Sequence, residues 1–96
     1  MDIFYHRNFS KSMRSLQKKE RQKVDRFLMS CESCTSAEDF ISKTEVKAIT
    51  GYTGFYRIRF GRYRLGIELD KNTNSITAHF AGPRGDFYKN FPPRRR

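Results

Sequence analysis

The strongest constraint on the fold of this chain lies in residues 55–69, where two alternating segments flank a two-residue loop. Residues 55–60 (FYRIRF) and 63–69 (YRLGIEL) alternate between apolar and polar positions, as half-buried β-strands do. The loop at 61–62 is Gly-Arg, the Gly-X form of a type II′ hairpin turn. A loop of this length places Phe60 opposite Tyr63 and so predicts the register of the whole hairpin.

This register divides the hairpin into an apolar side and a basic side. On the apolar side, Ile58 is predicted to face Leu65, and Tyr56 is predicted to face Ile67. Side chains of opposite faces alternate along a strand, so these four residues share one face. That face is therefore expected to be buried.

The other side of the hairpin, here called the arginine face, carries Arg57, Arg59 and Arg64, which are expected to form one exposed patch. Arg59 is predicted to stand opposite Arg64, and Arg57 opposite Gly66. Like charges directly opposite each other destabilise a sheet, and a bound anion would offset that cost. Arginine offers a planar, permanently charged donor group that suits phosphate. Gly66 has no side chain and is predicted to leave a floor on which a ligand can lie.

The other segments predict an α+β fold. Residues 2–7 (DIFYHR) read as a short strand, and residues 76–81 (ITAHFA) as the third strand of an antiparallel meander. Between them, the first third of the chain predicts a helical hairpin that begins at Asn8 or Ser10 and breaks near residues 17–20. Its apolar positions recur at helical spacing: Phe9, Met13 and Leu16, then Val24, Phe27, Leu28 and Cys31.

Residues 32–54 are less regular and contain the turn-rich run ESCTSAED. We expect a loop or short strand here, attached to the core by its apolar side chains. These are Phe40, Ile41, Val46 and Ile49. At 96 residues the chain is expected to be a single domain, with the N-terminal helical hairpin packed on one face of a twisted antiparallel sheet.

Charge indicates the kind of partner. Twenty Lys and Arg residues against ten Asp and Glu give a net charge of +10, which favours nucleic acid, an acidic protein or an anionic membrane. No apolar run approaches the roughly 18 residues of a membrane span, so we expect a cytoplasmic protein without a membrane partner. Cys31 and Cys34 form a lone C-x-x-C that reads as reduced structural thiols rather than a metal or redox site.

The C-terminal segment is predicted to add side chains to the arginine face. Residues 82–85 (GPRG) read as a turn that re-aims its arginine. Phe87 and Phe91 are spaced to pack inward, and Tyr88 is out of phase with them, so its hydroxyl could face the arginines. The tail FPPRRR reads as a proline stop followed by a solvated end, whose three arginines at 94–96 could also touch phosphate.

Two runs of residues resemble the RelE-like branch of the RelE/ParE toxin superfamily. They are G-Y-x-x-F-Y-R-I-R-F-G-x-Y-R-L-G-I-E at 51–68 and P-R-G-D-F-Y-K-N-F-P at 83–92. The resemblance implies two helices on one face of a twisted antiparallel sheet. It also implies a ribosome-associated ribonuclease that cuts messenger RNA, and an antitoxin that neutralises it. The active site that it implies consists of Arg57, Arg59, Arg64, Arg84 and Tyr88.

The chain departs from some members of this superfamily that carry Lys in place of Arg57 and Arg59. Arginine does not lose its proton in proteins, so neither residue can act as a general base. The base is therefore to be sought among Tyr88, His79, Glu68 and Asp86. Strand alternation is expected to place His79 on the arginine face, together with Thr77 and Ala81.

The resulting hypothesis is metal-independent cleavage of messenger RNA by attack of a 2′-hydroxyl on its own 3′-phosphate, with no cofactor. The predicted catalytic residues are Arg64, Arg84, Tyr88 and His79. The predicted RNA-binding residues are Arg57, Arg59, Arg62 and Lys89. The expected partners are messenger RNA on the ribosome and an acidic cognate antitoxin. The alternatives are a ParE-like inhibitor of DNA gyrase and a nucleic-acid-binding module without catalysis; facing arginines together with a tyrosine favour the nuclease.

Overall fold

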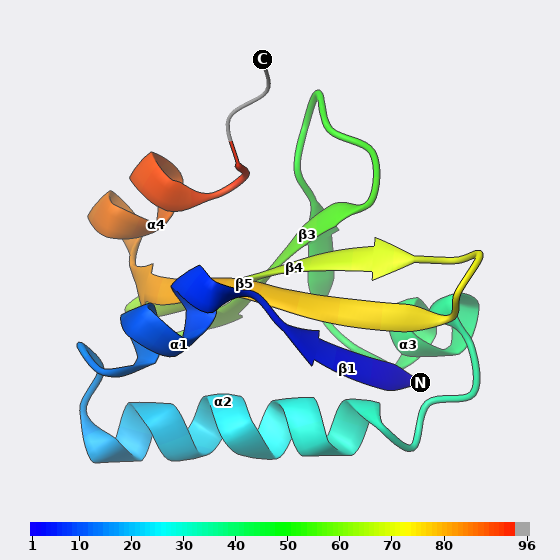
Figure 1. Cartoon of the computed structure of the whole chain (residues 1–96), viewed down its shortest axis with the longest axis horizontal. Helices are drawn as coiled ribbons and strands as arrows, with labels where there is room; N and C mark the ends of the chain where they lie inside the picture. Colours follow the sequence, from blue (N-terminus) through cyan, green and yellow to red (C-terminus); the bar gives the residue numbers. More distant parts are fainter. Residues whose placement is uncertain (94–96) are drawn as a thin grey trace.

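A computed structural model describes residues 1–93 and shows an α+β fold with helices on both sides of one sheet (Figure 1). The strands, in the sheet order β1-β5-β4-β3-β2, are β1 (Asp2–Tyr5), β2 (Val46–Ala48), β3 (Phe55–Phe60), β4 (Tyr63–Asp70) and β5 (Ser75–Pro83). The helices are α1 (Arg7–Met13), α2 (Lys18–Cys31), α3 (Ala37–Lys43) and α4 (Arg84–Asn90). The tail at 94–96, interpreted as a solvated end that could touch phosphate, lies outside the described residues.

The predicted hairpin register is confirmed. β3 and β4 pair antiparallel with Phe60 opposite Tyr63, and the pairing continues without interruption to the far end of β3. Gly61 has a φ of 60°, the left-handed conformation that the first position of a type II′ turn requires and that glycine adopts without strain. The predicted buried side is also correct, since Ile58, Leu65 and Ile67 lie in the core.

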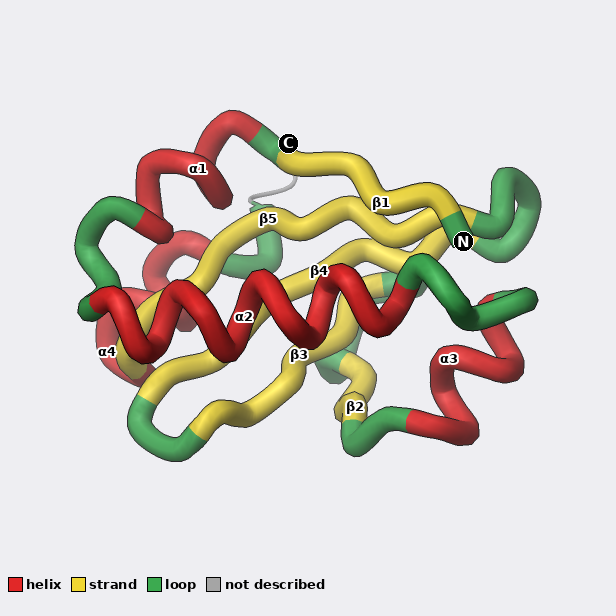
Figure 2. The backbone as a smooth tube through the Cα atoms, turned by 90° about the horizontal axis from the view of Figure 1, so that it is seen from below, coloured by secondary structure: helices red, strands yellow, loops and turns green. Residues whose placement is uncertain are grey.

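The sheet is mixed, whereas a purely antiparallel sheet was predicted. β3, β4 and β5 form the expected antiparallel meander, but β1 pairs parallel to β5, with Ile3 opposite Ile76. Parallel neighbours need a long crossover connection, and here most of the chain separates β1 from β5. The two N-terminal helices contribute to the core on one face of the sheet, as predicted, and α2 runs across that face (Figure 2).

Two predicted helix boundaries are wrong. Helix α1 is capped by His6 rather than by Asn8 or Ser10, because Nδ1 of His6 accepts a hydrogen bond of 3.0 Å from the backbone N–H of Asn8. The break before α2 lies at residues 14–17, one turn earlier than expected. The backbone N–H of Gln17 donates to the Glu20 carboxylate at 3.0 Å, which stabilises the start of α2 there.

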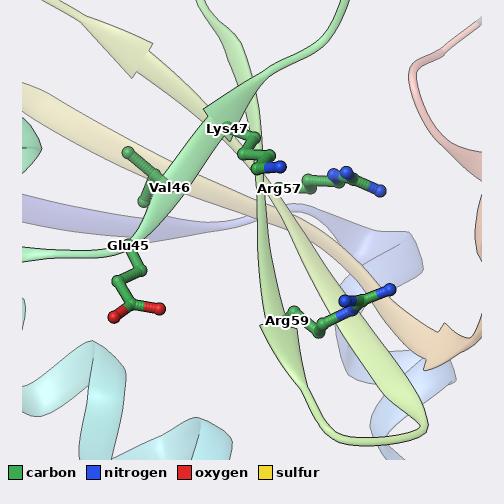
Figure 3. Close-up of a pocket in the computed structure, with 5 residues that line it drawn as sticks. All are labelled: Glu45, Val46, Lys47, Arg57 and Arg59. Atoms are coloured by element: carbon green, nitrogen blue, oxygen red, sulfur yellow. The ribbon is translucent and has the colours of Figure 1, made fainter.

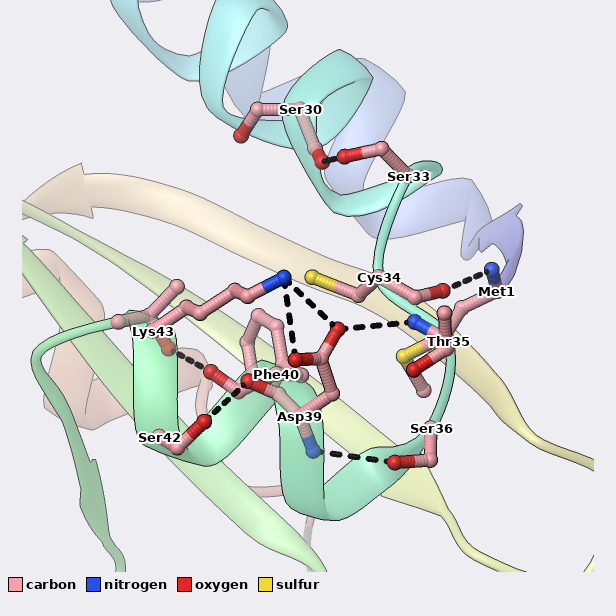
Figure 4. A network of polar contacts seen from close by, with 11 residues as sticks. Met1, Ser30, Ser33, Cys34, Thr35, Ser36, Asp39, Phe40, Ser42 and Lys43 are labelled. Carbon is pink, nitrogen blue, oxygen red and sulfur yellow. Dashed lines mark hydrogen bonds and ion pairs between the residues drawn. The ribbon is translucent and has the colours of Figure 1, made fainter.

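Helix α3 was not predicted, because its segment lacks a long apolar stripe. Polar contacts hold it instead (Figure 4). The Ser36 hydroxyl accepts a hydrogen bond from the backbone N–H of Asp39, and the Asp39 carboxylate accepts one from the N–H of Thr35 and pairs with Lys43. Phe40 is fully buried as expected, whereas Ile41 points outward. The short strand expected in this region is β2.

The predicted turn at residues 82–85 does not form. Gly82 and Pro83 end β5, and Arg84 begins α4 directly, since proline suits the boundary that precedes a helix. Phe87 and Phe91 are fully buried as predicted, and their packing holds α4 against the sheet. Within residues 1–93, no helix has both the length and the apolar character that crossing a membrane requires.

Candidate functional site

The arginine face forms around two cross-strand pairs of β3 and β4. Arg59 stands opposite Arg64, and Arg57 stands opposite Gly66, as the hairpin register predicted. Arg59 is exposed and Arg57 is half-buried, but Arg64 is only 4% exposed. The expectation that all three arginines lie on an exposed patch is therefore wrong for Arg64. The reason is α4, which folds back over this face of the sheet.

Tyr88 of α4 links the arginines to one another. Nη1 of Arg57 donates a hydrogen bond to the Tyr88 hydroxyl, across 31 residues of sequence. The guanidinium carbon of Arg64 lies 5.9 Å from the centre of the Tyr88 ring, within the range of a cation–π contact. Tyr88 is itself 45% exposed, so one part of its ring remains open above the two arginines. The cluster thus presents cations, a hydroxyl and an aromatic surface together.

Arg64 has an unusual environment for a charged group. Its Nε is buried and has no hydrogen-bond partner within residues 1–93. A buried donor without a partner is costly, and more so when it is charged. Within residues 1–93, Arg64 also has no ion pair with a carboxylate, so an anion beside Arg64 and Arg59 would supply the opposite charge.

The space above Gly66 is occupied by the protein itself. A Cβ atom at Gly66 would meet three atoms of the Phe91 ring at 2.6–2.8 Å. The expectation that Gly66 leaves a floor for a ligand is therefore wrong: the glycine admits the Phe91 ring against the strand. This contact anchors the end of α4, and it helps to hold Tyr88, three residues earlier, over the arginines.

The other predicted cations lie on the helix and the hairpin loop that adjoin this cluster. Arg84, at the start of α4, precedes Tyr88 by four residues, so the two lie on the same face of the helix. Arg62 is exposed in the hairpin loop, and Lys89 is exposed on α4 next to Tyr88. The structure thus brings Arg57, Arg59, Arg64 and Tyr88 into one cluster. Arg84 and Lys89 lie on α4 and Arg62 lies in the hairpin loop, the elements that carry this cluster.

Lys47 is a member of the cluster that the sequence did not reveal. It lies on β2 directly opposite Arg57. Lys47, Arg57 and Arg59 line a cavity of about 310 Å³, and all three side chains extend to the same side, whereas Glu45 points away from them (Figure 3). A second cavity of about 460 Å³ is lined by Lys47, Arg57 and Tyr88. A three-residue strand carries too little alternation to predict this position from sequence.

His79 lies on the same side of the sheet but outside the cluster. A β-bulge between β4 and β5 leaves His79 without a partner across the ladder, and it also turns Ala81 toward the core, against expectation. His79 is 8% exposed, and its Nε2 lies 3.0 Å from the Glu68 carboxylate. Burial lowers the pKa of His79 below its ordinary value, although the bond to Glu68 acts in the opposite direction.

The four candidates for proton transfer therefore occupy different places. Glu68 is four residues beyond Arg64 on β4, about 13 Å along the strand, and the Phe91 ring lies against the strand between them. His79 shares this distant position through its contact with Glu68. Asp86 lines a separate cavity of about 190 Å³ together with Ser12. Of the four, Tyr88 alone is part of the cluster.

Cys31 and Cys34 are free thiols buried in the core. Burial raises the pKa of the Cys31 thiol to about 12, so it stays protonated at neutral pH. Within residues 1–93, no three His, Cys, Asp or Glu side chains come together in a group that could hold a metal ion.

Comparison with known proteins gives a consistent picture. The chain is 32% identical over 73 residues to Toxin RelE3 of Methanocaldococcus jannaschii, and the match covers 76% of this chain and 81% of that toxin. No model of a known protein family matches the chain.

Solved structures of two toxin–antitoxin complexes share the fold of this chain. The RelB–RelE antitoxin–toxin complex from Methanococcus jannaschii superposes with a TM-score of 0.75 at 27% identity, over 93% of this chain and 99% of that one. The archaeal RelE–RelB complex from Pyrococcus horikoshii OT3 gives a TM-score of 0.68 at 23% identity, over 90% and 97% of the two chains. The second likeness, at its lower identity, supports the fold alone.

Proposed function

This chain belongs to the RelE family of toxins of toxin–antitoxin systems, and on this premise we propose that it is an endoribonuclease that cleaves messenger RNA without a metal. The observation that carries the proposal is the cluster on the arginine face. Three arginines and a tyrosine from three separate elements converge there, and the buried Nε of Arg64 has no partner within residues 1–93. RNA supplies the two things that such a cluster binds, a phosphate and a base.

The proposed reaction is attack of the RNA 2′-hydroxyl on the adjacent 3′-phosphate. It yields a 2′,3′-cyclic phosphate and a 5′-hydroxyl. Arg64 and Arg84 stabilise the negative charge that develops on the phosphorane, and a preorganised donor of this kind contributes about 3 kcal/mol. Arg57 and Arg59 hold the RNA backbone, with Arg62 and Lys89 as outer contacts. Tyr88 stacks on a base with its exposed ring.

We propose that the ribosome aligns the substrate, because the small site has few groups that could do so alone. A cluster with few groups able to move a proton is expected to cleave free RNA slowly. Alignment of the messenger in the ribosome would restrict the reacting atoms and lower the entropic part of the barrier. We therefore propose messenger RNA on the ribosome as the substrate.

We also propose an acidic antitoxin as the protein partner. The solved relatives from Methanococcus jannaschii and Pyrococcus horikoshii are complexes of RelE with RelB. A net charge of +10, concentrated in part on the arginine face, favours an acidic segment that covers Arg57, Arg59 and Arg64. Such a segment would compete directly with RNA.

The proposal is tested by two assays on the purified protein. The first is cleavage of messenger RNA on programmed ribosomes, repeated on free messenger RNA in excess EDTA because ribosomes themselves need Mg²⁺, and the second is supercoiling by gyrase. We expect RNA cleavage, no effect on gyrase, and no cleavage of a messenger with a 2′-deoxy nucleotide at the scissile position. Arg84→Ala should lose at least tenfold in rate, since tenfold corresponds to only about 1.4 kcal/mol. Cleavage of the deoxy substrate would rule out the proposed chemistry, and gyrase inhibition without RNA cleavage would rule out the proposed function.

A further inference from the structure

The proposed reaction needs a group that gives a proton to the departing 5′-oxygen, and the arginines of the cluster cannot act as that group. Arg57, Arg59 and Arg64 bind phosphate, but a guanidinium holds its proton too tightly to release it during the reaction. His79 lies outside the cluster, beside Glu68 and beyond the Phe91 ring. Tyr88 lies in the cluster, but its hydroxyl accepts the hydrogen bond that holds Arg57, and the proposed function uses its ring for stacking. A second group that can donate a proton is therefore needed beside it.

The position of Lys47 meets this need. Its partner across the β2–β3 ladder is Arg57, and cross-strand partners hold their Cβ atoms about 5 Å apart. Lys47 also lines both cavities that border the cluster, one with Arg59 and the other with Tyr88. Lys47 and Arg57 line both cavities, and their side chains extend to the same side (Figure 3).

The charge around Lys47 supports a bound anion in the same place. Lys47 and Arg57 form a like-charged pair directly opposite each other, and Arg59 and Arg64 form a second such pair on the same face. Like-charged pairs weaken a sheet. Within residues 1–93, neither Lys47 nor Arg57 forms an ion pair with a carboxylate. Glu45 lines the same cavity, but its side chain points away from these cations (Figure 3). Two adjacent like-charged pairs are an arrangement that a polyanion would stabilise.

We propose that Lys47 is the general acid of this site, an inference that rests on the proposed ribonuclease function. The 2′-oxygen forms a bond to phosphorus while the bond between phosphorus and the 5′-oxygen breaks. The proton of the 2′-hydroxyl leaves to water, and the Lys47 ammonium gives one proton to the 5′-oxygen. The resulting amine regains a proton from water, so the protein ends the cycle unchanged.

The test compares two substrates on programmed ribosomes. One messenger has the normal 5′-oxygen at the scissile bond, and the other has a bridging sulfur there. A thiolate departs without protonation, so a missing general acid matters only for the oxygen substrate. We expect Lys47→Ala and Lys47→Arg to cleave the oxygen substrate at least about 100-fold more slowly than wild type. On the sulfur substrate both variants should remain within about threefold of wild type, as a lost acid requires.

Control variants distinguish the loss of a general acid from the loss of a positive charge and from a loss of stability. Lys47→Arg keeps the positive charge, and Lys23→Ala removes an exposed lysine from α2, across the sheet from the cluster. Lys47 is exposed, so thermal unfolding of its variants should match wild type. Equal losses on both substrates would overturn the general-acid role while wild-type cleavage upholds the proposed function. Failure of wild type to cleave either substrate would overturn both.

Discussion

Arg57 on β3 donates a hydrogen bond to the hydroxyl of Tyr88 on α4, and this bond ties the C-terminal helix to the arginine face. The same Tyr88 ring lies near the guanidinium of Arg64. The Tyr88 side chain thereby contacts both Arg57 and Arg64, which lie on the two strands of the hairpin. The site depends on this helix as much as on the sheet.

Tyr88→Phe removes the hydroxyl and keeps the ring, so it isolates the bond to Arg57. We expect the rate of RNA cleavage to fall at least tenfold, because Arg57 loses its fixed position, while the free energy of unfolding falls by less than about 1.5 kcal/mol. Single-turnover cleavage and urea unfolding measure the two effects. Tyr5→Phe removes the hydroxyl of another exposed tyrosine, on β1, and should leave the rate unchanged. A normal rate in Tyr88→Phe would show that the ring acts by stacking alone.

The salt dependence of RNA binding reports how many cations contact phosphate. With Arg57, Arg59, Arg64 and Arg84 engaged, the logarithm of the affinity for a single strand should fall with the logarithm of salt with a slope of about −3. Arg59→Gln should make the slope shallower by about 0.7, whereas Arg26→Gln on α2 should not change it. Fluorescence anisotropy with a short RNA measures the slopes. A flat dependence would contradict an RNA site on the arginine face.

Gly66→Ala tests the contact between β4 and the C-terminal segment. The new methyl group would overlap the Phe91 ring, so the ring and α4 must move, and we expect a loss of about 1–3 kcal/mol in the free energy of unfolding. Gly85→Ala is the matched control, because its methyl group meets open space in α4 and alanine favours a helix. Urea unfolding compares the two. Equal stabilities would show that Phe91 is not held against Gly66.

The pH dependence of stability should include a contribution from His79. Burial lowers its pKa in the folded state, so the unfolded chain binds this proton more readily. The contribution is complete above the ordinary pKa of 6.5 and is lost as the pH falls below it. We expect the free energy of unfolding of wild type to decrease more than that of His79→Gln between about pH 7.5 and pH 5. Parallel curves for the two proteins would contradict a lowered pKa.

Cys31 should not react in the folded protein. Its thiol is buried, and its pKa of about 12 leaves almost no thiolate near pH 8. Alkylation by iodoacetamide, followed by mass spectrometry, should modify Cys31 only after unfolding in guanidinium chloride. Rapid modification under native conditions would show that this end of α2 opens readily.

The hairpin and its surroundings show how far local sequence information reaches. Strand alternation and a two-residue loop predicted every pair of β3 and β4, because these features act over a few neighbouring residues. The inward packing of Phe87 and Phe91 was predictable for the same reason. Helix α3 was missed because its polar caps, rather than an apolar stripe, stabilise it. The bulge at His79 was missed because one extra residue in a strand leaves no periodic signal.

The sequence by itself thus determined the register that sets Arg59 opposite Arg64 and gives the sheet one basic face. Only the tertiary structure decided that α4 buries Arg64 beneath Tyr88, that Phe91 fills the space above Gly66, and that β2 brings Lys47 beside Arg57. The physical reason is the range of the interactions. Alternation and turn geometry act between near neighbours in the chain, whereas these contacts join residues from separate elements, which meet only when the helices and strands pack.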